Sequence, residues 1–177
     1  MLAVTKTAFR GAHLSVPQIV ERRAQGYAAI RATGPMTDLP TFAPPLFPRL
    51  HDWLALNGVP SGTQGFFRYT AFGRDGSVEL EVGTTTRAPV SASPPVIAGL
   101  LPAGRYAMAT YAGPYDRLHD AFCMLEGWMG GRGLTPEGIY DSDYSRPACQ
   151  LEVYRVSPAQ TDNPSEWETD LLVKLAD

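Results

Sequence analysis

An internal repeat constrains the fold of this chain more than any other feature of its sequence. The run from Tyr27 to Pro35 and the run from Tyr106 to Pro114 both open with tyrosine and close with Gly-Pro at the same spacing. Such short apolar stretches predict strands, because proline cannot continue a sheet ladder and the glycine before it relaxes the turn. The repeat therefore indicates two copies of one structural unit.

A helical pattern follows each of the two predicted strands. Apolar residues recur there at three- and four-residue steps, which gives each helix one apolar stripe. The stripes consist of Leu46, Phe47, Leu50, Trp53 and Leu54 in the first copy and of Leu118, Phe122, Leu125, Trp128 and Met129 in the second. The patterns stop at Asn57-Gly58 and at Gly130-Gly131-Arg132-Gly133, where glycine supplies the left-handed geometry of a helix C-cap. We expect both stripes to be buried against a sheet.

Two further strands complete each copy. They span Phe66 to Phe72 and Ser77 to Gly83 in the first copy, and Cys149 to Val156 and Thr169 to Leu175 in the second. The turn Gly73-Arg74-Asp75-Gly76 predicts a hairpin between the first two strands, whereas a polar loop separates the second two. The order strand, helix, strand, strand is thus given twice.

The predicted fold is α+β, with tandem β-α-β-β modules related by pseudo-twofold symmetry, antiparallel sheets, helices on one side and a central groove. A chain of 177 residues, 44% of them hydrophobic, supplies one substantial core but not two domains. We expect an N-terminal extension over residues 1–16 and one domain over residues 17–177, with repeat 1 at about 17–88 and repeat 2 at about 96–177. Neither copy covers its sheet alone, so the two dock and leave a concave seam, where small ligands usually bind.

Composition argues against several classes of function. The formal net charge is -3 and no basic cluster occurs, which disfavours a general affinity for nucleic acid. No run approaches the ~20 apolar residues of a membrane helix, and Met1 to Arg10 lacks the apolar core of a signal peptide. We therefore expect a cytoplasmic protein that binds neither nucleic acid nor membranes and is a monomer or weak dimer.

Neither the cysteines nor the histidines follow a pattern typical of a metal or redox site. Cys123 and Cys149 lack CxxC spacing, so we expect two reduced, packed thiols. His13, His51 and His119 are scattered over a tail and two helices, without shared ligand spacing. The sequence also contains no serine elbow and no phosphate loop. We predict no metal and no cofactor.

Acidic residues alternate with apolar ones along the predicted strands. Glu81 and Asp170 stand opposite their apolar neighbours, and Glu152 shares a face with Tyr154. If the helices cover the apolar side, the acids and Tyr154 lie on the other side, with Tyr69 as their counterpart in the first copy. The competing interpretation is that these acids only solvate the open face of an antiparallel sheet.

Aromatic residues supply the remaining candidates for a ligand-binding wall. They are Phe67, Tyr69, Tyr111, Tyr115, Tyr140 and Trp128. Tyrosines near turns and strand ends can line a groove while their hydroxyls stay hydrated; Trp128 lies on an apolar helix stripe, where packing in the core is the competing interpretation. A carboxylate held among aromatic rings suits a delocalised organic cation, because ring faces attract cations and the carboxylate supplies the opposite charge.

Four short motifs resemble the GyrI-like small-molecule-binding domain, a family that includes the effector-binding domains of multidrug-responsive transcription regulators. They are Leu101 to Tyr106, Gly113 to Asp116, Glu152 to Tyr154 and Thr169 to Val173, and the resemblance spans roughly Pro17 to Leu175. It implies two fused modules around a groove that accepts bulky aromatic molecules, often lipophilic cations. Asp170 departs from the family, whose members tend to have Glu in the last strand, so its side chain is expected to reach less far into the groove.

The resemblance and the residues together favour a stand-alone protein that binds bulky aromatic, lipophilic cationic compounds, for multidrug binding, sensing or sequestration. We expect no helix-turn-helix region before the domain, since about 16 residues precede Pro17. One alternative is a hydrolase that detoxifies reactive small molecules, with Glu152 and Tyr154 doing acid and base work on water. A second alternative is a protein partner that inhibits gyrase, which the family name suggests.

Overall fold

The structure, a computed structural model, describes residues 12–177 of the chain. Most of the predicted N-terminal extension, including the segment from Met1 to Arg10 that is predicted to contain no signal peptide, lies outside these residues. In the part of the chain that is described, no helix is long and apolar enough to cross a membrane.

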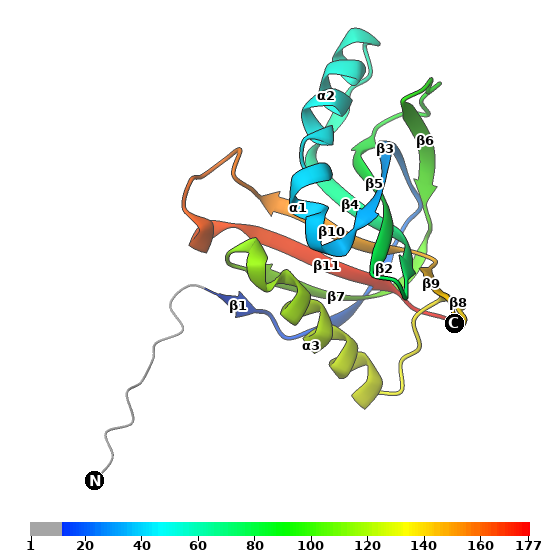
Figure 1. The fold of residues 1–177 in the computed structure, drawn as a ribbon, viewed down its shortest axis with the longest axis vertical. Helices are drawn as coiled ribbons and strands as arrows, with labels where there is room; N and C mark the ends of the chain where they lie inside the picture. Colours follow the sequence, from blue (N-terminus) through cyan, green and yellow to red (C-terminus); the bar gives the residue numbers. More distant parts are fainter. Residues whose placement is uncertain (1–11) are drawn as a thin grey trace.

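The two predicted modules are present as two sets of strand, helix, strand and strand (Figure 1). The first consists of β3 (Gln25–Pro35), α2 (Leu46–Leu56), β4 (Ser61–Gly73) and β5 (Ser77–Thr86). The second consists of β7 (Gly104–Ala112), α3 (Leu118–Gly131), β10 (Gln150–Val156) and β11 (Glu168–Lys174). The smaller elements are β1 (His13–Leu14), β2 (Gln18–Arg22), α1 (Leu39–Phe42), β6 (Val96–Leu101), β8 (Gly138–Tyr140), β9 (Tyr144–Pro147) and the 3-10 turns Met36–Asp38, Tyr115–Arg117 and Pro164–Glu166.

The strand order confirms the pseudo-twofold relationship between the modules. The main strands follow the order β7-β11-β10-β4-β5-β3, and neighbouring strands are antiparallel. Read outward from the centre, each half runs through its second, third and first strand. The symmetry axis therefore passes between β4 and β10, and these two strands form the middle of one curled sheet.

Each module also has a leading strand that the sequence pattern did not reveal. β2 pairs with β7 and β6 pairs with β3, so each leading strand crosses to the sheet half of the other module. Strict alternation between apolar and polar residues identifies a half-buried strand, and neither β2 nor β6 has it. The exchange joins the two modules by backbone hydrogen bonds at both ends of the sheet.

The helices end where glycine was expected to end them. Gly58 follows α2 with a φ of 63° and Gly133 follows α3 with a φ of 66°, the left-handed geometry of a C-cap. The predicted hairpin is also confirmed, because the Gly76 amide donates to the Gly73 carbonyl between β4 and β5.

The two apolar helix stripes are not buried equally. α3 buries most of its stripe against the sheet, but α2 buries only Leu50 and Leu54. Phe47 and Trp53 stay half-buried, so the prediction of a fully buried stripe is wrong for α2. The helices lie on the same side of the sheet at its two ends (Figure 1), and the space between them explains why Phe47 has no complete cover.

Candidate ligand-binding site

A cavity of about 1200 Å³ opens over the centre of the sheet, between α1 and α2 on one side and α3 on the other. The two central strands contribute its floor, with Phe67 and Tyr69 from β4 and Glu152 and Tyr154 from β10. The register explains this grouping: Glu152 is paired with Phe67 across the pseudo-twofold axis, and alternate residues of each strand face the same side. The cavity thus lies at the seam that the repeat predicts.

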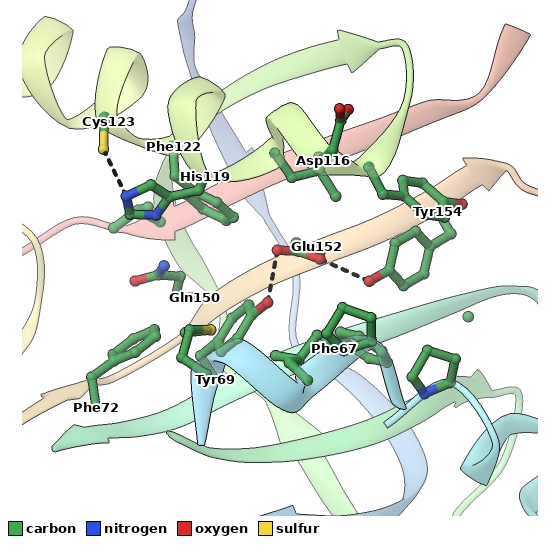
Figure 2. Close-up of a pocket in the computed structure, with 18 of the residues that line it drawn as sticks. Phe67, Tyr69, Phe72, Asp116, His119, Phe122, Cys123, Gln150, Glu152 and Tyr154 are labelled. Atoms are coloured by element: carbon green, nitrogen blue, oxygen red, sulfur yellow. Dashed lines mark hydrogen bonds between the residues drawn. The ribbon is translucent and has the colours of Figure 1, made fainter. Parts of the chain in front are cut away.

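Glu152 lies at the centre of this floor and is only 6% exposed. Its two carboxylate oxygens accept hydrogen bonds from the hydroxyls of Tyr69 and Tyr154, each at 2.7 Å (Figure 2). None of the ion pairs found within residues 12–177 involves Glu152. The site therefore holds a buried carboxyl group with two neutral donors and no positively charged partner among the described residues.

The pKa values in this cluster are shifted mainly by burial. Loss of hydration raises the pKa of the Glu152 carboxyl, while the hydrogen bonds from Tyr154 and Tyr69 act in the opposite direction. Burial, followed by the nearby Glu152 charge, raises the pKa of both Tyr69 and Tyr154 well above the ordinary value. Both tyrosines thus remain protonated donors at neutral pH.

Aromatic rings surround one side of the carboxyl group. Tyr154 meets the edge of Phe67 at a centroid distance of 5.3 Å, and Phe47 stacks on Phe67 at 5.5 Å. Tyr115 lies 5.5 Å from Tyr154 and itself packs on Trp167 at 4.6 Å. Rings from α2, β4, β10 and the turn before α3 therefore converge on one wall of the cavity.

The charged residues around the cavity are of one sign. Its lining includes three acids, Asp116, Glu126 and Glu152, and two histidines, His51 and His119. Among the residues that the structure describes, no Lys or Arg lines the cavity. Carboxyl groups are therefore the main charged groups of the lining that the structure describes.

The structure brings six of the predicted site residues together and separates the other four. The six that line the cavity are Glu152, Tyr154, Tyr69, Phe67, Tyr115 and Tyr140. Glu81, Asp170, Tyr111 and Trp128 are not part of the lining. The sequence-based expectation that all the strand acids share one open face is wrong, because Glu152 and Tyr154 lie on the helix-covered side and Glu81 on the other.

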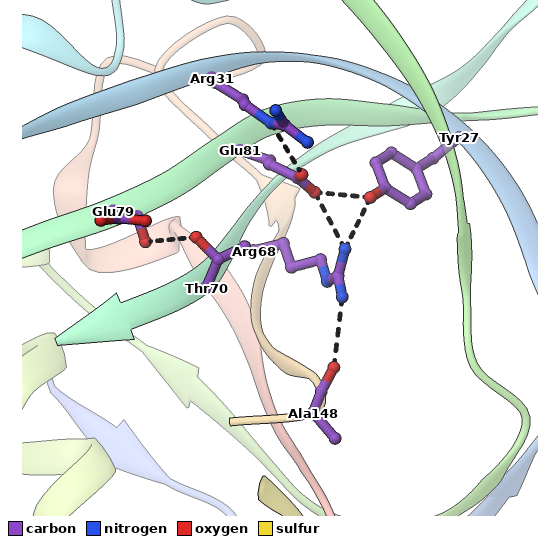
Figure 3. Close-up of polar contacts among 7 residues, drawn as sticks. All are labelled: Tyr27, Arg31, Arg68, Thr70, Glu79, Glu81 and Ala148. Atoms are coloured by element: carbon purple, nitrogen blue, oxygen red, sulfur yellow. Dashed lines mark hydrogen bonds and ion pairs between the residues drawn. The ribbon is translucent and has the colours of Figure 1, made fainter. Parts of the chain in front are cut away.

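Glu81 belongs to a polar cluster on the far face of the sheet (Figure 3). It is 5% exposed, accepts a 2.5 Å hydrogen bond from the Tyr27 hydroxyl, and lies 3.1 Å from the Arg68 guanidinium and 3.7 Å from that of Arg31. Burial and the bond to Glu81 raise the pKa of Tyr27 to about 12. Glu81 therefore already has its counter-ions, and it sits opposite Leu80 and Val82, which face the helices.

The other three separated residues also have structural partners. Asp170 accepts a hydrogen bond from Thr110 at 2.7 Å and lies 3.5 Å from Arg155. Tyr111 is buried and its hydroxyl donates to the Pro114 carbonyl at 2.9 Å. Trp128 is half-buried under the guanidinium of Arg132, 4.7 Å from the ring centroid.

Several lining residues were not identified from the sequence. His119 and Cys123 project from α3 into the cavity, and His51 does so from α2. The sequence does contain a signal for the α3 residues of the lining. Beside the apolar stripe, a second stripe recurs at the same helical spacing and consists of His119, Cys123, Glu126 and Gly130. The prediction of two packed thiols is correct for Cys149, which is buried, and wrong for Cys123, which is exposed. Cys123 lies on the cavity side of α3, so it has no sheet to pack against.

Comparisons with known proteins agree with this geometry. The family model of the GyrI-like small molecule binding domain matches residues 15–176, so the chain belongs to that family of small-molecule-binding domains. The structure is similar to the C-terminal domain of EcmrR, with a TM-score of 0.72 and 15% identity over 92% of this chain and 98% of that one. In the complex of EcmrR with DNA the TM-score is 0.74 at 15% identity, over 93% of this chain, which spans 58% of the EcmrR chain.

Two more distant structures share the fold. SAV2435 bound to tetraphenylphosphonium has a TM-score of 0.57 and 10% identity, over 92% of this chain and 94% of that one. A hydrolase from Listeria innocua has a TM-score of 0.62 and 11% identity, over 90% of this chain and 91% of that one. A comparison with curated proteins found none that matches.

Proposed function

We propose that this domain reversibly binds bulky aromatic cations in the cavity over β4 and β10, as a sensing or sequestering protein, with Glu152 as the counter-ion. The observation that carries the proposal is the buried Glu152 carboxyl group, which lies between two tyrosine hydroxyls and forms no ion pair within residues 12–177. An ionised carboxylate is costly to bury without such a partner. A bound cation supplies the missing charge, so its affinity gains from relief of that cost.

The rest of the cavity supports the same class of ligand. Ring faces attract cations by about 0.5–2 kcal/mol each. Tyr154 donates to the Glu152 carboxylate, and Phe67 is the cross-strand neighbour of Glu152. A cavity of about 1200 Å³ is large enough for a drug-sized molecule. SAV2435, which shares the fold, was determined bound to an aromatic cation, tetraphenylphosphonium.

A fluorescence titration tests this function. Rhodamine 6G, an aromatic cation, is expected to bind the wild-type protein at least about tenfold more tightly than Nile red, an uncharged dye of similar size. Glu152→Gln is expected to remove this preference while keeping the shape of the side chain. Glu79→Gln is the matched control, because Glu79 is an exposed acid outside the cavity lining. Equal affinity for both dyes, or an unchanged preference in Glu152→Gln, would show that the carboxylate is not the counter-ion.

A hydrolase is the second candidate, and the raised pKa of Glu152 is the observation that favours it. A carboxyl group with a raised pKa can donate a proton to a leaving oxygen or, once ionised, activate water, with Tyr154 as a neighbouring donor. The hydrolase from Listeria innocua shares the fold. Turnover of an aryl epoxide to its diol, measured by mass spectrometry and lost in Glu152→Gln, would establish this function in place of simple binding.

The third candidate, a gyrase-inhibiting partner, stays a prediction, as do the cytoplasmic location and the monomeric or weakly dimeric state. A pull-down with purified gyrase, with and without rhodamine 6G, tests the partner. Recovery of gyrase would support this candidate, and its loss in the presence of the dye would show that gyrase and the dye compete.

A further inference from the structure

A thiol and an imidazole meet on the wall of the same cavity. The Sγ atom of Cys123 lies 3.7 Å from Nε2 of His119, a hydrogen-bond distance for sulfur, and both side chains line the cavity. Their four-residue spacing puts them on one face of α3, and Figure 2 shows that face turned toward Tyr69 and Glu152. The wall of the cavity therefore carries a thiol beside an imidazole.

The two cysteines of the chain differ in their access to ligands. Cys123 is exposed at the cavity wall, whereas Cys149 is buried on the far face and burial raises the pKa of its thiol. A thiol reacts as its thiolate, and an adjacent imidazole assists by accepting the proton. Cys123 thus has the two requirements for reactivity, access and a proton acceptor, and Cys149 serves as an internal control.

Aromatic side chains line the cavity beside the pair. Phe122 lies between His119 and Cys123 in sequence and also lines the cavity, and Tyr69 and Phe72 stack on each other at 5.2 Å across from it. Glu152, more than nine-tenths buried, faces the same space. An aromatic group bound there brings its substituents within reach of the α3 wall.

We propose that Cys123 covalently captures soft electrophiles that enter the cavity, of the class of α,β-unsaturated carbonyl compounds that carry an aromatic group. A bond forms between Sγ and the β-carbon, and the π electron pair of the alkene moves to the carbonyl oxygen as an enolate. His119 Nε2 accepts the thiol proton and returns it to the α-carbon. The step is a net addition, in which no group leaves and no oxidant or reductant takes part.

This capture rests on the proposed function in one respect: the cavity must admit an aromatic ligand. It goes beyond that function because it assigns a second chemical role, retention of reactive compounds, to residues of α3 that contribute nothing to the carboxylate cluster on the sheet.

Intact-protein mass spectrometry tests the capture with two reagents, N-(1-naphthyl)acrylamide and acrylamide, and glutathione as the reference thiol. The naphthyl reagent is expected to give one adduct, mapped to Cys123, at a rate that saturates with its concentration. For each thiol, the rate with the naphthyl reagent is divided by the rate with acrylamide. This ratio is expected to be at least about tenfold larger for the protein than for glutathione, because the cavity positions the aromatic group. A linear concentration dependence, the same ratio as glutathione, or an adduct on another residue would overturn the inference.

Two substitutions separate the roles on α3. His119→Gln is expected to lower the limiting adduct rate by at least about tenfold while the concentration for half-saturation stays within about twofold. Met124→Ser, at the exposed position next to Cys123 but outside the cavity lining, is the matched control and is expected to keep the wild-type rate. An unchanged limiting rate in His119→Gln would remove the imidazole from the step.

Rhodamine 6G binding, measured on the same wild-type sample, distinguishes the two proposals. Dye binding with unselective alkylation would reject the capture and leave the proposed function in place. Saturable addition to Cys123 without dye binding would reject the cation function and support the capture.

Discussion

Tyr69 and Glu152 meet across the pseudo-twofold seam: the tyrosine hydroxyl of one module donates to the carboxylate of the other at 2.7 Å, although the residues are 83 positions apart in the chain. Their partner Tyr154 donates to the second carboxylate oxygen. The three side chains come from β4 and β10, which are the adjacent central strands of the sheet. The candidate site is therefore a product of the duplication, because neither module contains it alone.

Glu152 is expected to lower the free energy of unfolding at neutral pH. Burial raises the pKa of its carboxyl in the folded protein above the ordinary value, so the folded state holds its proton to higher pH than the unfolded chain does. The contribution of Glu152 to stability is thus most favourable at acidic pH and falls as pH rises through the folded-state pKa. Glu152→Gln lacks this dependence and is therefore expected to be more stable than the wild-type protein at pH 7.

Urea unfolding followed by tryptophan fluorescence at pH 4, 5, 6 and 7 checks this expectation. The difference in the free energy of unfolding between Glu152→Gln and wild type should grow with pH. A difference that shrinks toward neutral pH would mean that the folded protein stabilises the charged carboxylate, which is the opposite of the expected sign.

Cation binding is expected to depend on pH in the same region. The bound cation favours the ionised carboxylate, so binding below the folded-state pKa of Glu152 requires the loss of its proton. The affinity for rhodamine 6G should be constant above the raised pKa and fall below it by up to about tenfold per pH unit. Titrations from pH 4 to 8 measure this profile, and Nile red serves as the control that should show no such slope.

The Tyr69 and Tyr154 hydroxyls are expected to lower the pKa of the Glu152 carboxyl. Tyr69→Phe and Tyr154→Phe keep the rings and remove one donor each, and a hydrogen bond to a charged group is worth about 1.5–3 kcal/mol. Since those bonds lower the pKa of Glu152, each substitution should raise it further and move the pH profile of dye binding upward. An unshifted profile in both variants would show that the hydroxyls do not act on the carboxylate.

Glu81 is expected to support the fold and not the ligand. Glu81→Gln leaves the Arg68 guanidinium and the Tyr27 hydroxyl without their buried carboxylate, which is expected to lower the free energy of unfolding by about 2–4 kcal/mol. Rhodamine 6G affinity of the folded variant should stay within about twofold of wild type, because Glu81 lies on the far face of the sheet. A loss of affinity like that of Glu152→Gln would place Glu81 in the binding role that the sequence first suggested.

Local signals in the sequence predicted most of the fold. The Gly-Pro ends of the first strands, the glycines after α2 and α3, and the turn at Gly73 act within a few residues, and the structure confirms each of them. The leading strands β2 and β6 were missed because their pairing partners lie in the other module and their own sequences do not alternate.

The site was only partly predictable for a related reason. Alternation within β10 correctly placed Glu152 and Tyr154 on one face. The alternation does not show which of the two faces the helices cover. That depends on the register between β10 and β4, in which Glu152 is paired with Phe67. Contacts between segments far apart in the chain set this register. A carboxyl group on a helix-covered face is also the exception to ordinary patterning, and such exceptions are typical of functional sites.

The position of a bound cation tests the central claim most directly. In a crystal structure of the protein with tetraphenylphosphonium, the phosphorus atom is expected within about 6 Å of the Glu152 carboxylate, with phenyl groups against Phe67 and Tyr154. Two results would contradict the role given to this carboxylate. One is a cation bound outside the cavity, and the other is a cation bound inside it with the Tyr69 and Tyr154 hydroxyls separating it from Glu152.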